Sequence, residues 1–106
     1  MPAPLRGQVW EYTSGSRQYR VLIISSDEYN DTERAFPWAL GIEREAPAVP
    51  GYLIRLSAAD PLTGAAVDVT RVVRVDTTAL RRVLGYVSTE TLNAVERGLR
   101  EFLSLP

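Results

Sequence analysis

The chain has 106 residues, 45% of them apolar and 24% charged, as expected for one soluble globular domain that buries its own core. It contains no cysteine and no histidine, which excludes disulfide bonds, thiolate metal sites and imidazole as a catalytic acid or base. All twelve basic residues are arginine, and the net charge of −1 excludes nucleic-acid binding by overall charge. Any RNA contact therefore requires a local arginine cluster.

No feature of the sequence indicates export or membrane insertion. The N-terminal Met1–Pro4 segment has no basic stretch followed by an apolar run, so we expect no signal peptide. No apolar stretch approaches the roughly 18 residues needed to span a membrane. We expect a single domain over residues 1–106, located in the cytoplasm, without membrane contact, cofactor or metal.

The chain is predicted to begin with a β-hairpin. Polar and apolar residues alternate over 8–12, which places Val9 on one face of a strand and Trp10 on the other. Residues 13–17 have turn composition, with a glycine that is free to take positive φ. The β-branched and apolar run 19–25 predicts a central strand.

Shorter β-segments follow, separated by loops. Residues 27–33 are polar and loop-like, and 35–42 are a third strand candidate whose proline marks its start or an edge. A connection over 47–51 leads to a fourth strand over 52–56. Residues 60–64 have the composition of a tight turn.

The next segment, 65–75, keeps a period of two in its valines and predicts one strand or two short ones. Residues 76–83 are predicted to form a short helical turn, which Gly85 ends near a helix C′ position. These two segments complete the β-rich part of the chain.

A C-terminal helix is the clearest single element. Ser88 can cap it, Glu90 in its first turn favours the helix dipole, and Glu96 and Arg100 are spaced to form an ion pair. One apolar stripe at helical spacing predicts a buried face, made of Leu92, Val95, Leu99, Phe102 and Leu103. The predicted fold class is mainly β with a C-terminal α-helix (α+β), a small and partly open barrel.

Three segments, in order, resemble the MazF/PemK-type toxins, small bacterial ribonucleases paired with antitoxins. They are the opening Arg6–Trp10, the strand end Leu22–Asp27, and the Leu84–Leu92 approach to the last helix. The resemblance covers nearly the whole chain. It implies an SH3-like barrel of the MazF/CcdB type, a homodimer, sequence-specific metal-independent cleavage of single-stranded RNA, and neutralisation by a cognate antitoxin.

The positions that serve RNA cleavage in this family are altered here. The family begins its second strand with Arg-Pro, where this chain has Tyr19 and Arg20, so that a one-residue shift or a bulge could give Arg20 the role. The Thr-Ser that ends the third strand corresponds to Glu43 and Arg44, and a later Arg-Cys-Asp-Gln-like segment corresponds loosely to Asp68–Arg71. Activity therefore cannot be carried over whole.

Cleavage of RNA without a metal needs a base for the 2′-hydroxyl, a cation for the phosphate charge and an acid for the leaving oxygen. In a chain without histidine or lysine, Glu43 is the candidate base and Arg20 the candidate catalytic cation. Arg44 is a poorer partner because it alternates to the other side of the strand. The expected RNA contacts are Arg17, Tyr19, Thr70 and Arg71. The same residue types are also common on solvated strand ends without any function.

Two other functions remain open. The fold can have lost its catalytic residues and kept only binding to an antitoxin, to RNA or to another protein. A DNA gyrase poison of the CcdB type shares the fold, but that activity is associated with a Trp-Gly-Ile ending, and this chain ends Leu103–Pro106.

Overall fold

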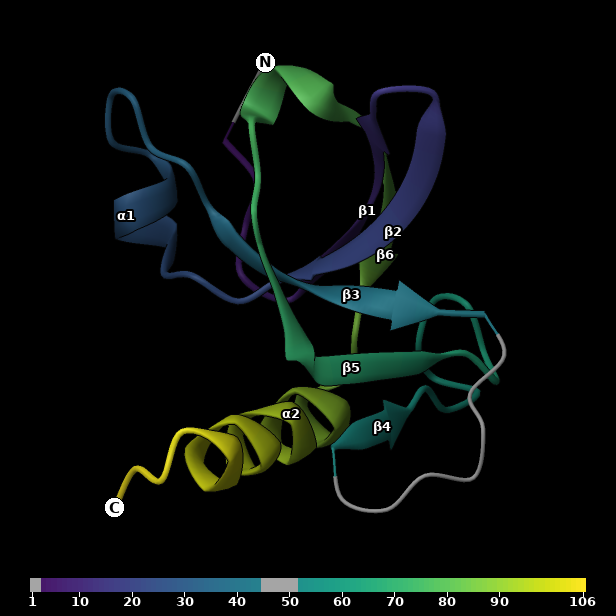
Figure 1. Cartoon of the computed structure of the whole chain (residues 1–106). Coiled ribbons are helices and arrows are strands. Elements are labelled where there is room, and N and C mark those ends of the chain that lie inside the picture. The colour runs from purple at the N-terminus through teal and green to yellow at the C-terminus, as the bar shows by residue number, and fades with distance from the viewer. Residues whose placement is uncertain (1–2, 45–51) are drawn as a thin grey trace.

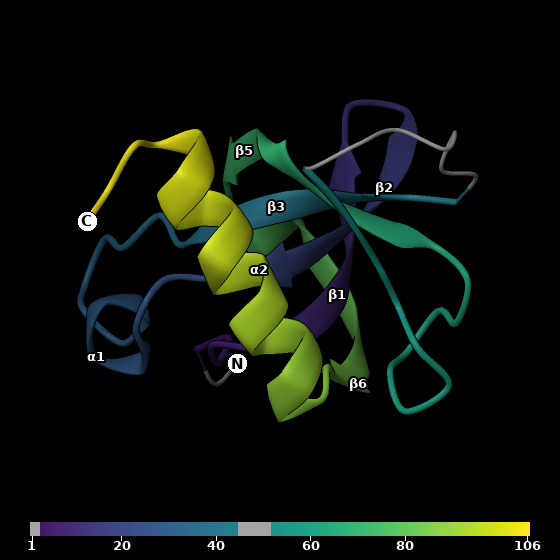
Figure 2. The same cartoon turned by 90° about the horizontal axis from the view of Figure 1, so that it is seen from below.

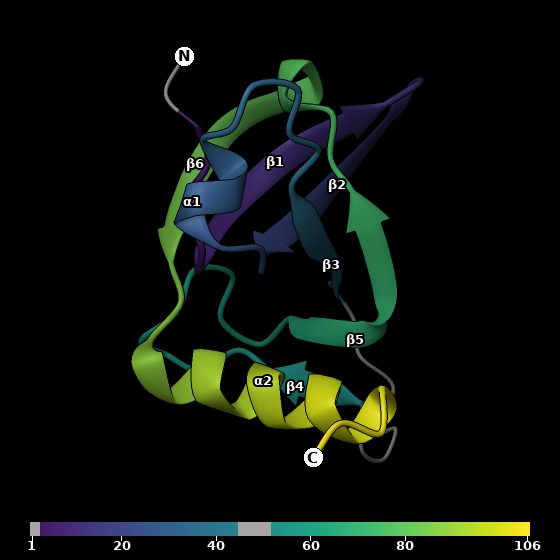
Figure 3. The same cartoon turned by 90° about the vertical axis from the view of Figure 1, so that its left-hand side faces the viewer.

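The computed structural model describes residues 3–44 and 52–106, and in this part of the chain six strands form one antiparallel sheet (Figure 1). The strand order is β4-β5-β3-β2-β1-β6. The bounds are β1 Gln8–Ser14, β2 Arg17–Ile23, β3 Trp38–Glu43, β4 Leu53–Arg55, β5 Ala66–Arg74 and β6 Leu80–Tyr86, with helices α1 Asp27–Asn30, η1 Thr77–Ala79 and α2 Thr89–Phe102. The sheet curls from β6 round to β5, and α2 lies across its lower end (Figure 3). The predicted fold class, a small barrel with a C-terminal helix, is confirmed.

The first hairpin is tighter than predicted. Ser14 pairs with Arg17, so the turn has only Gly15 and Ser16 between the strands, and Gly15 has a φ of 61°. The predicted turn over 13–17 is therefore too long, because Thr13, Ser14 and Arg17 belong to the strands and pair across the hairpin. The hairpin extends well beyond the core and positions the residues of the candidate site.

The sheet buries a separate apolar cluster on each face, as the alternation predicts. Val9, Leu22 and Leu40 lie on the face covered by α2, where they belong to a cluster that includes Val95 of the helix. Trp10 lies on the opposite face, in a cluster completed by Val21, Ile23, Ala39, Val75 and Leu80. A fully buried Val or Leu contributes about 1.5–3 kcal/mol of transfer free energy, so both faces are held by their apolar residues.

The segment after β5 differs from the prediction. Asp76 starts only a short 3₁₀ turn, in which the amide and hydroxyl of Thr78 donate to its carboxylate at 3.0 and 2.7 Å. The predicted helical turn over 76–83 is therefore confirmed only at its start, because from Leu80 onward the chain forms β6, which pairs with β1. Gly85 lies within this strand, with a φ of 136°, and ends no helix.

Other boundaries shift by a few residues. The predicted loop over 27–33 contains α1, which Ser26 caps, and β3 begins just after Pro37 rather than at residue 35. The fourth strand is shorter than predicted, and 65–75 form one strand, β5, with a bulge. The predicted connection over 47–51 lies outside the described residues.

Helix α2 begins where predicted, with the hydroxyl of Ser88 accepting from the amide of Thr91 at 3.2 Å. Seen from below, the helix crosses the strands (Figure 2), and its Gly98 lies against Val69 of β5. The apolar stripe is buried only in part, since Val95 is fully buried whereas Phe102 and Leu103 at the end of the helix are exposed. The predicted core face therefore stops short of the last turn.

Two polar contacts fix α2 to the rest of the molecule. Glu96 forms its ion pair with Arg6 from the chain start, rather than the predicted one with Arg100. The buried carboxylate of Asp60 accepts from the amide of Ser88 and the hydroxyl of Thr91, both at 2.6 Å, and also from Ser57. Burial raises the pKa of Asp60, but these hydrogen bonds outweigh it and lower the pKa to about 2.

Candidate functional site

A pocket of about 200 Å³ lies between the β1–β2 hairpin and strands β3 and β5. Its polar lining brings together Tyr19 and Arg20 from β2 and Arg71 from β5. The backbone of Gly41 in β3 forms part of its wall. The remaining lining residues are Tyr12, Ser14, Val21, Ile42 and Val73. Three of the residues predicted to bind or cleave RNA therefore meet in one place.

A bulge in β5 determines where Arg71 lies. Leu40 pairs with Val72, but the next residue of β3, Gly41, pairs with Asp68, so three residues of β5 have no partner between them. The amide and hydroxyl of Thr70 donate to the Asp68 carboxylate at 2.9 and 2.7 Å and hold the bulge in shape. The bulge aims the side chain of Arg71 across β3 towards β2.

The guanidinium of Arg71 contacts residues from two other strands. Its Cζ lies 5.6 Å from the centre of the Tyr19 ring, within the range of a cation–π contact. Its Nη1 lies 3.7 Å from Oε1 of Glu43, which is too long for a hydrogen bond but close enough for an ion pair. A fixed cation, an aromatic ring and a carboxylate thus lie side by side at the rim of the pocket.

Arg20 has different surroundings. It pairs with Glu11 across the hairpin and also lines a second pocket, of about 290 Å³, with Glu11, Gln18, Tyr19 and Arg44. Glu11 itself binds the guanidinium of Arg82 at 2.7 Å. Arg20 therefore lies next to the carboxylate of Glu11, which already pairs with Arg82.

The structure separates two predicted RNA contacts from the pocket. Arg17 is exposed at the tip of the hairpin, where it pairs with Ser14, and does not line the pocket. Thr70 directs its hydroxyl to Asp68 and is part of the bulge. Of the predicted set, Tyr19, Arg20 and Arg71 contribute to the lining of the pocket and Glu43 pairs with Arg71, whereas Arg17 and Thr70 do neither.

Gly41 is a site residue that the sequence analysis missed. A Cβ built on Gly41 would lie 2.6 Å from Cδ of Arg71, so the arginine stem passes directly over its backbone. A glycine inside a strand often marks the close approach of another group. That signal was present in the apolar run of β3, where a glycine lies between Leu40 and Ile42.

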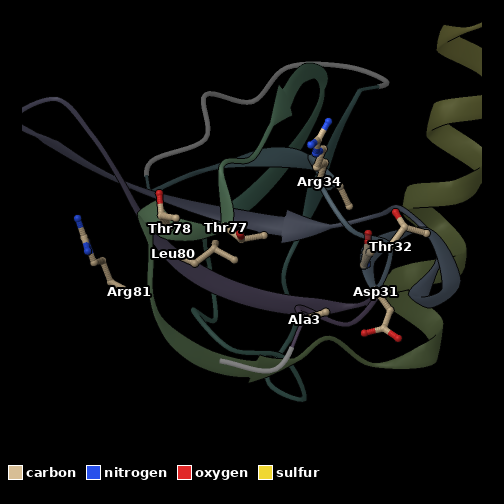
Figure 4. Close-up of a pocket in the computed structure, with 10 residues that line it drawn as sticks. Ala3, Asp31, Thr32, Arg34, Thr77, Thr78, Leu80 and Arg81 are labelled. Atoms are coloured by element: carbon tan, nitrogen blue, oxygen red, sulfur yellow. The ribbon is translucent and has the colours of Figure 1, made fainter.

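A larger pocket, of about 520 Å³, lies elsewhere, between the segment after α1 and η1. Figure 4 shows Thr32 and Arg34 on one side of it and Thr77 and Thr78 on the other, while Arg81 extends away. None of the predicted site residues lines it. We therefore do not take it as the candidate site, although it is larger than the pocket at Arg71.

Within residues 3–44 and 52–106, no three acidic side chains come together in a group that could hold a metal ion. None of the helices in these ranges is long and apolar enough to cross a membrane.

Comparison with protein families matches residues 6–103 to the family described as PemK-like, MazF-like toxin of type II toxin–antitoxin system. Comparison with curated protein sequences gives no match. Among solved structures, an endoribonuclease from a mycobacterial species in complex with its cognate antitoxin is 29% identical, with a TM-score of 0.86, and the match covers 100% of this chain and 98% of that one.

Two further structures show the same fold. Another mycobacterial endoribonuclease is 28% identical with a TM-score of 0.84, over 100% of this chain and 96% of that one. The MazE–MazF complex of Deinococcus radiodurans is 19% identical with a TM-score of 0.84, over 98% of both chains. At 19% identity the last comparison supports the fold alone.

Proposed function

Because the chain belongs to the PemK-like, MazF-like toxins of type II toxin–antitoxin systems, we propose that it is a sequence-specific endoribonuclease that cleaves single-stranded RNA without a metal. Two solved relatives at 28–29% identity are endoribonucleases, which supports this activity. The observation that carries the proposal is the convergence of Tyr19, Arg71 and Glu43: Tyr19 and Arg71 line one pocket, and Glu43 forms an ion pair with Arg71.

The site contains the groups that the reaction needs. Glu43 is the proposed base that takes the proton from the 2′-hydroxyl, whose oxygen then bonds to phosphorus. The bond from phosphorus to the 5′-oxygen breaks, and the products are a 2′,3′-cyclic phosphate and a 5′-hydroxyl that has gained a proton. The arginines of the pocket stabilise the added negative charge on the phosphate.

One further group must act as the acid that protonates the 5′-oxygen. Tyr19 is the candidate, because it lines the same pocket as Arg71 and its ring centre lies 5.6 Å from Cζ of that arginine. We therefore assign Tyr19 to RNA binding, with the acid as its second role.

The proposal is tested with the purified full chain and a long, mixed-sequence RNA in excess chelator, with both ends of each fragment mapped. We expect cuts at a short recurring motif that leave 5′-hydroxyl and 2′,3′-cyclic phosphate ends. Glu43→Gln and Arg20→Ala proteins, purified in the same way, exclude a contaminating nuclease if they cut less. Intact RNA at high protein concentration would contradict the proposal.

A binding module without catalysis is the second candidate. The observation in its favour is that the positions of the family's RNA-cleaving residues are occupied by other residues in this chain. These are Tyr19, Glu43 and the segment Asp68–Arg71. In that case the wild-type chain binds RNA or an antitoxin and leaves RNA intact, which the same experiment detects.

We also propose a cytoplasmic homodimer that a cognate antitoxin neutralises. A solved relative at 29% identity is in complex with its cognate antitoxin, which supports the partner. An exposed aromatic patch supports the homodimer. In it, Phe36 and Trp38 flank the guanidinium of Arg74, whose Cζ lies 5.4 and 5.0 Å from their ring centres. Val72, also exposed, lies two residues away on the same strand as Arg74. Aromatic residues and arginine are enriched at the centres of protein interfaces.

A further inference from the structure

We propose that Arg71, rather than Arg20, binds the scissile phosphate, and that Gly41 is the positioning residue that allows it to do so. The inference rests on the proposed function, since it assigns roles within the same pocket. It adds a residue of β3 that has no functional group and acts only by leaving space.

The space that a side chain at position 41 would enter is occupied by Arg71. The three atoms nearest to a Cβ at position 41 all belong to Arg71: Cδ at 2.6 Å, Cγ at 3.1 Å and Nε at 3.2 Å. The backbone of Gly41 does not have a positive φ, so its conformation does not require glycine. Glycine in a strand costs stability relative to other residues, and here it gives the arginine stem a path across β3.

The guanidinium of Arg71 contacts an aromatic ring on one side, and it is still accessible to a ligand. The Tyr19 ring supports its face, and the side chain of Arg71 is still 46% exposed. Glu43 lies 3.7 Å away, beyond hydrogen-bond distance, so a phosphate can take the N–H groups in a bidentate contact without breaking a formed hydrogen bond. Arg71 is thus oriented before RNA binds.

Arg20 lacks this orientation. It alternates with Leu22 onto the face opposite to Val21 and lies next to Glu11. No ion pair or ring contact holds it among the described residues. A side chain that must be ordered on binding contributes less than one already in place, so its loss should matter less.

The experiment measures cleavage of the mixed-sequence RNA and binding of its 2′-O-methyl analogue, which cannot be cut, for six variants. They are Arg71→Ala, Arg71→Lys, Gly41→Ala, the Gly41→Ala/Arg71→Ala double variant, Arg20→Ala and, as an exposed arginine on α2, Arg97→Ala. Melting temperatures confirm that each protein folds. Because the atoms that the added methyl group would meet belong to a flexible side chain, we expect Gly41→Ala to fold.

Arg71→Ala should lower the cleavage rate about 100-fold, as loss of one preorganised donor does, and Arg71→Lys should restore only part of it. The plot of log K, the RNA association constant, against log salt concentration has a negative slope. Its magnitude should decrease by about 0.7 in Arg71→Ala, because one contact to a single-stranded phosphate is lost. Arg20→Ala should lower cleavage by a smaller factor, and Arg97→Ala should behave as the wild type.

The double variant decides the role of Gly41. If Gly41 acts through Arg71, Gly41→Ala lowers cleavage and binding in the wild-type background but not in the Arg71→Ala background. An equal loss in both backgrounds, or a greater loss in Arg20→Ala than in Arg71→Ala, would overturn the inference. If Gly41→Ala does not fold, the Arg71 and Arg20 variants still decide which arginine binds phosphate.

Failure of the proposed function gives a different result. A wild-type chain that binds the 2′-O-methyl RNA and cuts no RNA contradicts the ribonuclease proposal, while the binding data still test Arg71 and Gly41. A wild-type chain that binds no RNA overturns the assignment of Arg71.

Discussion

At the scale of single residues, the candidate site depends on where one arginine can reach. Sequence reasoning placed the catalytic cation at Arg20, because that residue is adjacent to the position where the resembled family has its arginine. The structure places the guanidinium of Arg71 between Tyr19 and Glu43 instead. Glu43 then has a cation beside it that comes from a different strand, and its proposed role as base can be tested separately.

Substitution Glu43→Gln should lower the cleavage rate by a factor of about 100 to 10,000, the usual contribution of a general base. Gln is nearly isosteric with Glu and removes only the charge, so we expect the melting temperature to change little. The measurement is a single-turnover rate with RNA of one mapped cutting motif. A Glu43→Gln protein that cuts at the wild-type rate would exclude Glu43 as the base.

At the scale of elements, a polar contact joins the 57–64 turn to the start of α2. Asp60 accepts from Ser57, Ser88 and Thr91, and it is only 7% exposed. Sequence reasoning identified the Ser88 cap but treated Asp60 as an ordinary turn residue. The contact between them joins two segments that no local pattern relates.

The lowered pKa of Asp60 makes stability depend on pH. Since the pKa is about 2 in the folded chain and 3.8 ordinarily, the folded state favours the ionised carboxyl, and this stabilisation is present above about pH 4. It is lost as the pH falls from about 4 to about 2, and its full size is about 2 kcal/mol. Urea unfolding at a series of pH values measures it.

Asp60→Asn should remove this part of the pH dependence and lower stability at neutral pH. Asp76→Asn is the matched control, because hydrogen bonds from Thr78 also lower the pKa of Asp76, which is fully exposed. We expect the control to keep most of the pH dependence between about pH 2 and 4. If Asp60→Asn and the wild type lose stability in parallel over this range, the assignment to Asp60 is wrong.

At the scale of the whole molecule, the exposed patch of Phe36, Trp38, Val72 and Arg74 is the surface that we assign to the homodimer. Register places Val72 and Arg74 of β5 on the same face as Trp38 of β3, outside the part that α2 covers. Symmetric dimers are the commonest oligomers, and they bury more apolar surfaces than transient complexes do.

Val72→Glu should convert the dimer to a monomer, because it would bury an unpaired charge in the interface. Val83→Glu on β6 is the matched control, since Val83 is 43% exposed and Val72 is 42% exposed. Sedimentation velocity over a range of concentrations distinguishes the two states. A monomeric wild type, or dissociation of both variants alike, would contradict this assignment of the surface.

The sequence by itself determined the features that depend on neighbouring residues. Alternation placed Val9 and Trp10 on opposite faces of β1, and the cap at Ser88 marked the start of α2. The ordered resemblance of three segments indicated the family, which comparison confirms over residues 6–103. In each of these cases the signal lies within a few residues of the feature that it predicts.

Only the tertiary structure decided the features that depend on pairing between distant strands. Segment 80–86 became a strand rather than part of a helical turn because β1 provides its hydrogen-bond partners. Arg71 entered the site because a bulge in β5 and the missing side chain of Gly41 in β3 coincide. Backbone hydrogen bonds and steric space between strands are set by register, and register is a property of the assembled sheet.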